Sequence, residues 1–370
     1  MRHLMLPRRA LLRCGLAAAS LGLGTAAAAR APRVVFLNPG EPVERGTGPY
    51  WRMVSRFMEM AAASLGFTLE IVYAERDHLL MLRQAQQLGE RGDAPDYVVI
   101  VNEKSTAPQM LELLDRSSAK VMVIHNDVTA EQRRETGDER QRYPRWIGSA
   151  VPDNPLSGWR LMEELYRQTP EREPLVIGIT GDPLTPVSQE RAQGVADYIA
   201  HAARGRALQL VHGDWSYADG ERKGEVLLAR YPDAHVLWAA NDSMALGALR
   251  AVRARYARVR VGGMGGWPEA LTSIAEGGLA ATAAGHYLIG AWALVLLHDY
   301  HHGLDFAAAG GPAQKLDFLY VVARENVARY DRALFRDAAP IDFRTFSKVA
   351  SRRGSYDFRI DALVRNTRTG

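Results

Sequence analysis

Four asparagines follow short apolar runs of strand length, and this placement is the pattern in the sequence that could do chemistry. They are Asn38, Asn102, Asn126 and Asn241, with Asp127 and Asp242 next to the last two. An asparagine side chain offers two donors and one acceptor without a charge that must be desolvated. A ring of asparagines therefore suits a neutral polyhydroxyl ligand. The alternative is that each one caps a helix or shapes a turn, as this residue type often does.

Aromatic residues accompany these asparagines. Tyr50 and Trp51 begin a predicted helix, Trp215 lies in a loop after an apolar run, and Trp267 begins another helix. An indole face against the C–H face of a sugar ring buries apolar area and leaves the hydroxyl groups free to hydrogen bond. Packing in the interior is the alternative for each ring. The loop positions of Trp51 and Trp215 favour a ligand contact.

The elements that must position these side chains are short β-branched runs that alternate with helical patterns. The runs form two series, at 33–37, 69–73, 97–101 and 121–125, and at 175–180, 208–212, 236–240, 259–263 and 280–284. Continuous apolar runs of this length are typical of parallel strands that are buried on both faces. Nine runs exceed one ordinary sheet. We therefore predict an α/β fold of two doubly wound, Rossmann-like lobes with parallel sheets and a multi-strand hinge.

This fold would bring the polar residues together, because the carboxyl ends of parallel strands lie along one edge of a sheet. A closed eight-stranded barrel is the competing architecture. The charged stretch 127–146 interrupts the rhythm of strands and predicts the connection between the lobes. The predicted N-terminal lobe comprises 32–146 and 286–316. The predicted C-terminal lobe comprises 147–285 and 317–340, and 341–370 form an extension.

Residues 1–31 are typical of an export signal. Arg8 and Arg9 precede an apolar stretch that ends in A-x-A cleavage options, which resembles a twin-arginine signal, with an ordinary secretory signal as the alternative. We therefore expect a periplasmic protein whose mature chain does not span the membrane. The only cysteine, Cys14, lies in this segment, so the mature chain has no thiol chemistry and no disulfide.

The segment also carries the positive charge of the chain. Its five arginines, with no acidic residue, account for more than the formal net charge of +4, so their removal leaves −1. A basic footprint for nucleic acid disappears with them.

No enzyme motif is present, neither a G-x-S-x-G elbow nor a phosphate-binding P-loop, so we expect neither catalysis nor a nucleotide cofactor. Three histidines near the end of the 286–302 helix have a spacing that could hold a metal, but they more simply complement the helix dipole. Asp182, Asp214 and Asp242 could supply carboxylates for glycoside cleavage, although nothing in their spacing requires it. We expect no metal and no cofactor.

Three segments carry a resemblance to a known family: ANDSMALGAL at 240–249, SQERAQG at 188–194 and VGGMGGWP at 261–268. With them the chain resembles the periplasmic solute-binding proteins of the ribose-binding type, especially sugar-transport and autoinducer-2 receptors. The likeness covers essentially the whole mature chain. It implies ligand contacts from Asn38, Tyr50, Trp51, Asn102 and Asn126 in the first lobe, and from Arg191, Trp215 and Asn241 in the second. Asp127, beside Asn126, and Trp267 complete the predicted site.

The resemblance implies a protein that captures a sugar or sugar-like compound between two lobes and presents it to an ABC-transporter permease. Delivery of the ligand signal to a membrane-bound sensor kinase is the alternative. Gly265 and Gly285 stand where the family usually carries an aspartate and a glutamine, which implies a reshaped pocket. The loop 39–49 is longer than the usual short turn after the first strand and could cover the cleft.

Overall fold

The computed structural model describes residues 30–361, apart from 44, 203 and 337–340, together with residue 363. Cys14 therefore lies outside the described residues, as does the predicted export signal apart from its last two residues, 30 and 31. The description below concerns the unit that begins at Pro32.

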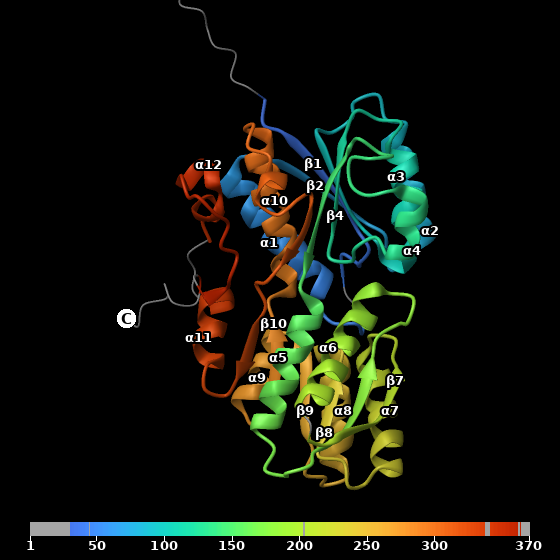
Figure 1. Ribbon diagram of the computed structural model, residues 1–370, viewed down its shortest axis with the longest axis vertical. Coiled ribbons are helices and arrows are strands. Elements are labelled where there is room, and N and C mark those ends of the chain that lie inside the picture. Colours follow the sequence, from blue (N-terminus) through green and yellow to red (C-terminus); the bar gives the residue numbers. More distant parts are fainter. Residues whose placement is uncertain (1–29, 44, 203, 337–340, 362, 364–370) are drawn as a thin grey trace, which may run out of the picture. The chain divides into compact units, whose positions relative to one another are not determined.

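The first lobe is built on a six-stranded parallel sheet in the order β11-β5-β4-β3-β1-β2. Its strands are β1 (Arg33–Asn38), β2 (Thr68–Tyr73), β3 (Tyr97–Val101), β4 (Lys120–Ile124), β5 (Trp146–Pro152) and β11 (Ala313–Leu316). Helices α1 (Tyr50–Leu65) and α10 (Ile289–His301) cover one face. Helices α2 (His78–Gly89), α3 (Ala107–Leu114) and α4 (Ala130–Thr136) lie on the other face (Figure 1).

The second lobe has a six-stranded sheet in the order β12-β10-β9-β8-β6-β7. Its strands are β6 (Leu175–Thr180), β7 (Arg206–His212), β8 (Val236–Ala239), β9 (Arg260–Gly265), β10 (Ala281–Ala284) and β12 (Tyr320–Ala323). Helix α5 (Asn154–Arg167) packs on α6 (Pro186–Ala202), and α7 (Tyr217–Arg230) packs on α8 (Asp242–Ala254). The edge strand β12 is antiparallel to β10, whereas the other pairs are parallel. The predicted two-lobe α/β fold is confirmed, with this one antiparallel edge.

The sequence periodicity explains the elements that support the site. All five side chains of β3 are buried, as expected for a Val- and Ile-rich central strand. Helix α1 buries the apolar positions that recur at helical spacing, from Trp51 to Leu65, and ends at Gly66. Gly66 has a φ of 77°, and its N–H bonds to the carbonyl of Ala62.

The predicted connection between the lobes at 127–146 is wrong. These residues form α4 and a turn that lead from β4 into β5 of the same sheet. Their charges serve local pairing, since Arg133 forms ion pairs with Asp127, Asp138 and Glu139. The charge run thus marks a surface helix with a capping box rather than a linker, and the lobe boundary moves from residue 146 to the end of β5.

Within the described residues the chain passes between the two sheets three times, after β5, after β10 and after β11. These crossings form the hinge. The C-terminal residues return to the first lobe, where Phe343, Phe346 and Phe358 pack around Trp292 of α10. Among the residues that the structure describes, there is no helix with the length and apolar character needed to cross a bilayer.

Candidate ligand-binding site

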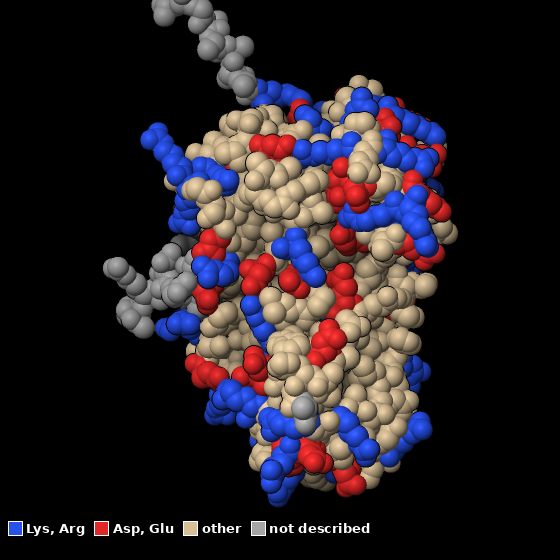
Figure 2. Space-filling view, in the orientation of Figure 1, with Lys and Arg blue, Asp and Glu red and all other residues tan. Residues whose placement is uncertain are grey.

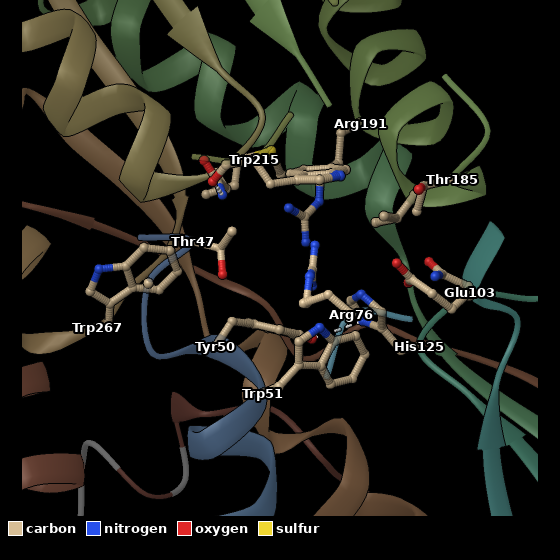
Figure 3. Close-up of a pocket in the computed structure, with 15 residues that line it drawn as sticks. Thr47, Tyr50, Trp51, Arg76, Glu103, His125, Thr185, Arg191, Trp215 and Trp267 are labelled. Atoms are coloured by element: carbon tan, nitrogen blue, oxygen red, sulfur yellow. Dashed lines mark hydrogen bonds between the residues drawn. The ribbon is translucent and has the colours of Figure 1, made fainter. Parts of the chain in front are cut away.

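A cavity lies between the lobes at the carboxyl ends of the strands (Figure 3). It holds about 550 Å³ of empty space, a volume that includes the open solvent at its mouth. The first lobe lines it with Thr47, Gly48, Tyr50, Trp51, Arg76, Glu103, His125 and Asn126. The second lobe contributes Thr185, Val187, Arg191, Trp215, Asn241, Met264 and Trp267.

Seven of the ten predicted site residues line this cavity. They are Tyr50, Trp51, Asn126, Arg191, Trp215, Asn241 and Trp267. Residues that are far apart in the sequence and belong to two lobes thus line one cavity. This agrees with the rule that the carboxyl ends of parallel strands lie along one edge of a sheet, which we call the strand-end rule. Their contact with a ligand stays a prediction.

Asn38 does not line the cavity. Its Nδ2 donates to the carbonyl of Trp51 at 3.1 Å and to Ser55 Oγ at 2.9 Å, and its Oδ1 accepts from Gly40 N–H at 2.7 Å. The side chain is fully buried behind the first turn of α1. Asn38 therefore positions Trp51, which does line the cavity.

Asn102 and Asp127 are also absent from the cavity lining. Asn102 Nδ2 donates to the carbonyl of Asp127 at 2.7 Å, and its Oδ1 accepts from the N–H of Ala107 at 3.0 Å. The carboxylate of Asp127 accepts from Arg133 at 2.9 Å. Both side chains shape the turns after β3 and β4, which is the structural role that asparagine and aspartate often have in loops.

An aromatic cluster forms the first-lobe wall. Tyr50 and Trp51 meet edge to face with ring centroids 4.9 Å apart, and the Trp51 ring lies 5.2 Å from His125. Tyr50 Oη and His125 Nδ1 share a hydrogen bond of 2.8 Å. Burial lowers the pKa of His125 well below its ordinary value, and the positive charge of Arg191 lowers it further. His125 is therefore neutral at physiological pH.

Arg191 is the buried cation of the second-lobe wall. Its Nη1 donates to the carbonyl of Ala240 at 2.6 Å, and its Nε has no hydrogen-bond partner among the described residues. Burial lowers its pKa to about 10, so it stays protonated at neutral pH. Gly194 lets α6 bring it there, because a Cβ at this position would lie 1.9 Å from the carbonyl oxygen of Pro155 on α5.

Trp215 and Asn241 form a second wall element. Asn241 Nδ2 donates to the carbonyl of Trp215 at 2.8 Å, and its Oδ1 caps α8 by accepting from Met244 N–H at 2.9 Å. The Trp215 ring packs against Gly181, where a Cβ would lie 1.9 Å from Trp215 Cζ2. Asn241 thus serves as a helix cap and as a cavity residue at once.

Asp242 lies behind the cavity and holds the end of β9 in place. Its carboxylate accepts from Thr282 Oγ1 at 2.7 Å and from Gly266 N–H at 2.6 Å. Burial raises its pKa to about 6. The neighbouring Gly265 has a φ of 157°, and a Cβ there would lie 2.4 Å from Cζ3 of Trp267. The buried ring of Trp267 therefore occupies the space that a side chain at 265 would need.

Sequence reasoning missed five polar residues of the lining: Thr47, Arg76, Glu103, His125 and Thr185. Arg76, Glu103 and His125 each lie within three residues of the end of a first-sheet strand. The strand-end rule that selected the asparagines applies to them equally. A prediction built on the asparagines and their neighbouring aspartates omits them, although residues one to three positions past each strand end face the same edge.

Two α/β lobes with a cavity at the facing strand ends define the architecture of a solute-binding protein that encloses its ligand. A family model described as a periplasmic binding protein domain matches residues 43–304. The chain belongs to this family.

Individual proteins are similar to this chain at several levels. The ribose import binding protein of Salmonella typhimurium is 27% identical over 237 residues, which cover 64% of this chain and 75% of that protein. A periplasmic sugar-binding protein from Pseudomonas fluorescens is 34% identical with a TM-score of 0.78, over 90% of this chain and 99% of that one. A periplasmic solute-binding protein from Actinobacillus succinogenes with bound D-allose shares the fold at 17% identity, with a TM-score of 0.71 over 81% of this chain and all of that one.

Proposed function

We propose that this protein captures a sugar or sugar-like compound in the cavity between its lobes and presents it to an ABC transporter. The observation that carries the proposal is the lining itself, where indole rings, a buried amide and a buried guanidinium from two lobes face one small space. The similar ribose-binding and sugar-binding proteins support the same ligand class. The predicted export signal and these relatives support a periplasmic location.

Asn126 gives the strongest local argument for a polar ligand. Its Oδ1 and Nδ2 are both buried, and neither has a hydrogen-bond partner among the described residues. A buried polar atom left without a partner costs roughly 1–3 kcal/mol. A sugar hydroxyl both donates and accepts, so a bound polyol supplies the partners that the protein lacks at this position.

The same geometry explains how binding is converted into a signal. Across the cleft, the N–H of Tyr217 on α7 donates to the carbonyl of Gly46 at 3.2 Å. Tyr50 Oη of the first lobe reaches the carbonyl of His286, in the crossing after β10, at 3.4 Å. A ligand that contacts both walls favours the closed arrangement by its differential affinity for the two states. The closed surface is what a membrane partner recognises.

The partner can be an ABC-transporter permease or, in the alternative, the sensor domain of a kinase. Both use the same ligand site, so the site does not separate them. The sugar-binding relatives named for ribose import favour transport. Stimulation of ATP hydrolysis by a reconstituted permease–ATPase complex, with and without ligand, distinguishes the two partners.

A thermal-shift screen of pentoses, hexoses, polyols and sugar acids tests the proposed function. A ligand at a hundredfold excess over its Kd adds about 2.7 kcal/mol to the free energy of unfolding, which appears as a raised Tm. Trp215→Ala should abolish that rise and leave the Tm of the ligand-free protein close to that of the wild type. The proposal fails if no compound of these classes raises the Tm, or if Trp215→Ala responds like the wild type.

A further inference from the structure

Two guanidinium groups from opposite lobes are directed into the cavity (Figure 3). Arg76 comes from the loop between β2 and α2 of the first lobe, and Arg191 comes from α6 of the second. Like charges repel, and this repulsion is stronger in a site shielded from water than in bulk solvent. Closing the cleft therefore brings two cations into one small space.

Neither guanidinium is neutralised by a bonded carboxylate. The Nη1 of Arg191 bonds to a carbonyl oxygen, and its Nε is unpartnered among the described residues. The side chain of Arg76 forms neither a hydrogen bond nor an ion pair within the described part of the chain; only its backbone N–H bonds, to Pro39. The donors of both residues remain available to a ligand.

Glu103 is the acidic side chain of the cavity lining, and it interacts electrostatically with Arg76 without bonding to it, whereas the lining holds two arginines. Asp242 and Glu190 interact with Arg191 electrostatically, but their carboxylates are bonded elsewhere. Asp242 accepts from Thr282 and Gly266, and Glu190 accepts from Asn154. The lining thus carries one more positive than negative charge.

The face of the molecule drawn in Figure 2 shows no comparable excess of positive charge. On the face drawn in Figure 2, Lys and Arg side chains are interspersed with Asp and Glu and form no continuous basic field. On this face, an anion would therefore be held by the cavity arginines rather than drawn in by a basic surface.

We propose that the ligand is a sugar acid, a monosaccharide-sized polyhydroxyl compound whose single carboxylate bonds to Arg76 and Arg191. This inference rests on the proposed function and narrows its ligand class. The planar fork of arginine donors matches a carboxylate in two parallel hydrogen bonds. One negative charge balances the excess of one positive charge, whereas the roughly two charges of a phosphate would exceed it. Trp51 and Trp215 are then available to pack against the sugar ring, and the amide of Asn126 is available to bond its hydroxyl groups.

Matched ligand pairs test the proposal by isothermal titration calorimetry on the full mature protein. The pairs are D-galacturonate with D-galactose, D-glucuronate with D-glucose, and D-gluconate with D-sorbitol, with glucose 6-phosphate as the phosphate probe and sodium acetate as the simple anion. In at least one pair the carboxylate should bind at least tenfold more tightly than its neutral partner. Its affinity should fall as the ionic strength rises.

Two variants make the test specific. Arg76→Gln should weaken binding of the sugar acid at least tenfold and change binding of the neutral partner less than threefold. Arg83→Gln is the control, because Arg83 is an exposed arginine in the adjoining helix α2 and its ion pair with Asp77 is 3.5 Å long. This variant should change neither the affinity for the sugar acid nor the affinity for its neutral partner. Arg76→Lys should recover part of the loss, because it restores the charge without the fork.

The outcomes distinguish failure of the sugar-acid inference from failure of the proposed sugar-binding function. If neutral sugars bind as tightly as their acids and Arg76→Gln affects both equally, the sugar-acid inference is overturned while the sugar-binding function stands. Preferred binding of the phosphate, or of acetate as well as of the sugar acids, also overturns it. If neither acids nor neutral sugars bind, the proposed function fails with it.

Discussion

At the scale of single residues, two asparagines at equivalent strand ends have opposite roles. Asn38 is fully buried and makes three hydrogen bonds that hold the start of α1. Asn126 is equally buried, yet neither of its side-chain polar atoms has a partner among the described residues. A satisfied amide stabilises the ligand-free protein, whereas an unsatisfied one stabilises only the complex.

Alanine substitutions should separate these roles. Asn38→Ala removes the hydrogen-bond acceptor of the Gly40 N–H. It should therefore lower the free energy of unfolding of the ligand-free protein by about 1–3 kcal/mol. Asn126→Ala removes two unpaired atoms, so it should leave that free energy unchanged or raise it, and should weaken ligand binding about tenfold, the equivalent of 1.4 kcal/mol. Urea unfolding and calorimetry measure the two quantities. The reverse pattern would show that the roles are assigned to the wrong asparagines.

At the scale of elements, the loop that joins β1 to α1 closes the cavity against the second lobe. Thr47 and Gly48 line the cavity, and the carbonyl of Gly46 accepts from Tyr217 on α7. Gly46 and Gly48 have φ values of 92° and 81°, which disfavour any residue with a Cβ. Only Gly48 faces a neighbour, since a Cβ there would lie 2.4 Å from Ser243 Oγ and 3.1 Å from Trp267 Cζ2.

These two glycines form a matched pair for testing closure. Gly48→Ala should weaken ligand affinity about tenfold or more, because the added methyl group clashes with the second lobe only when the cleft is shut. Gly46→Ala carries the same backbone strain, but its Cβ has nothing within 4 Å among the described residues. It should leave affinity nearly unchanged. If both variants lost ligand affinity equally, the cause would be backbone strain in the loop. That result would contradict a loop that closes the cavity by packing against Ser243.

At the scale of the whole molecule, one buried carboxyl couples the stability of the protein to pH. Asp242 begins α8, and its carboxylate ties the turn after β9 to Thr282 of β10. Its pKa of about 6 lies above the ordinary value of 3.8 because burial penalises the charged form. The folded protein therefore holds this proton more tightly than the unfolded chain does. The associated stability is fully present below pH 3.8 and is lost as pH rises through 6.

Asp242→Asn removes this dependence, and its effect should differ between pH 5 and pH 7.5. A shift of about two pKa units corresponds to about 3 kcal/mol over the whole titration, and roughly half of this is lost between pH 5 and pH 7.5. The variant should therefore gain free energy of unfolding relative to the wild type as the pH rises across this interval, because only the wild type ionises a buried carboxyl at position 242. Urea unfolding of both proteins at several pH values measures the difference. A difference that is independent of pH would mean that Asp242 titrates at its ordinary pKa.

The pattern of residues in the sequence determined the fold class and most of the elements. Buried parallel strands need continuous apolar runs, and covering helices need apolar residues at helical spacing, so both leave a local signature such as 97–101 or Trp51 to Leu65. The lobe boundary was misplaced because a charged surface helix, α4, has the composition of a linker. Charge patterning reports exposure, and exposure does not distinguish a helix within a lobe from a connection between lobes.

Only the tertiary structure decided which residues at the strand ends face the cavity. Asn38, Asn102 and Asn126 all lie at the ends of their strands, yet the side chains of the first two bond backbone groups and that of the third has no partner among the described residues. A side chain's direction depends on the turn geometry and on neighbours distant in sequence, such as Ser55 for Asn38 and Gln132 for Asn102. The placement of Arg76 and Arg191 around one cavity likewise exists only once two lobes face each other, because no local pattern relates residues on separate sheets.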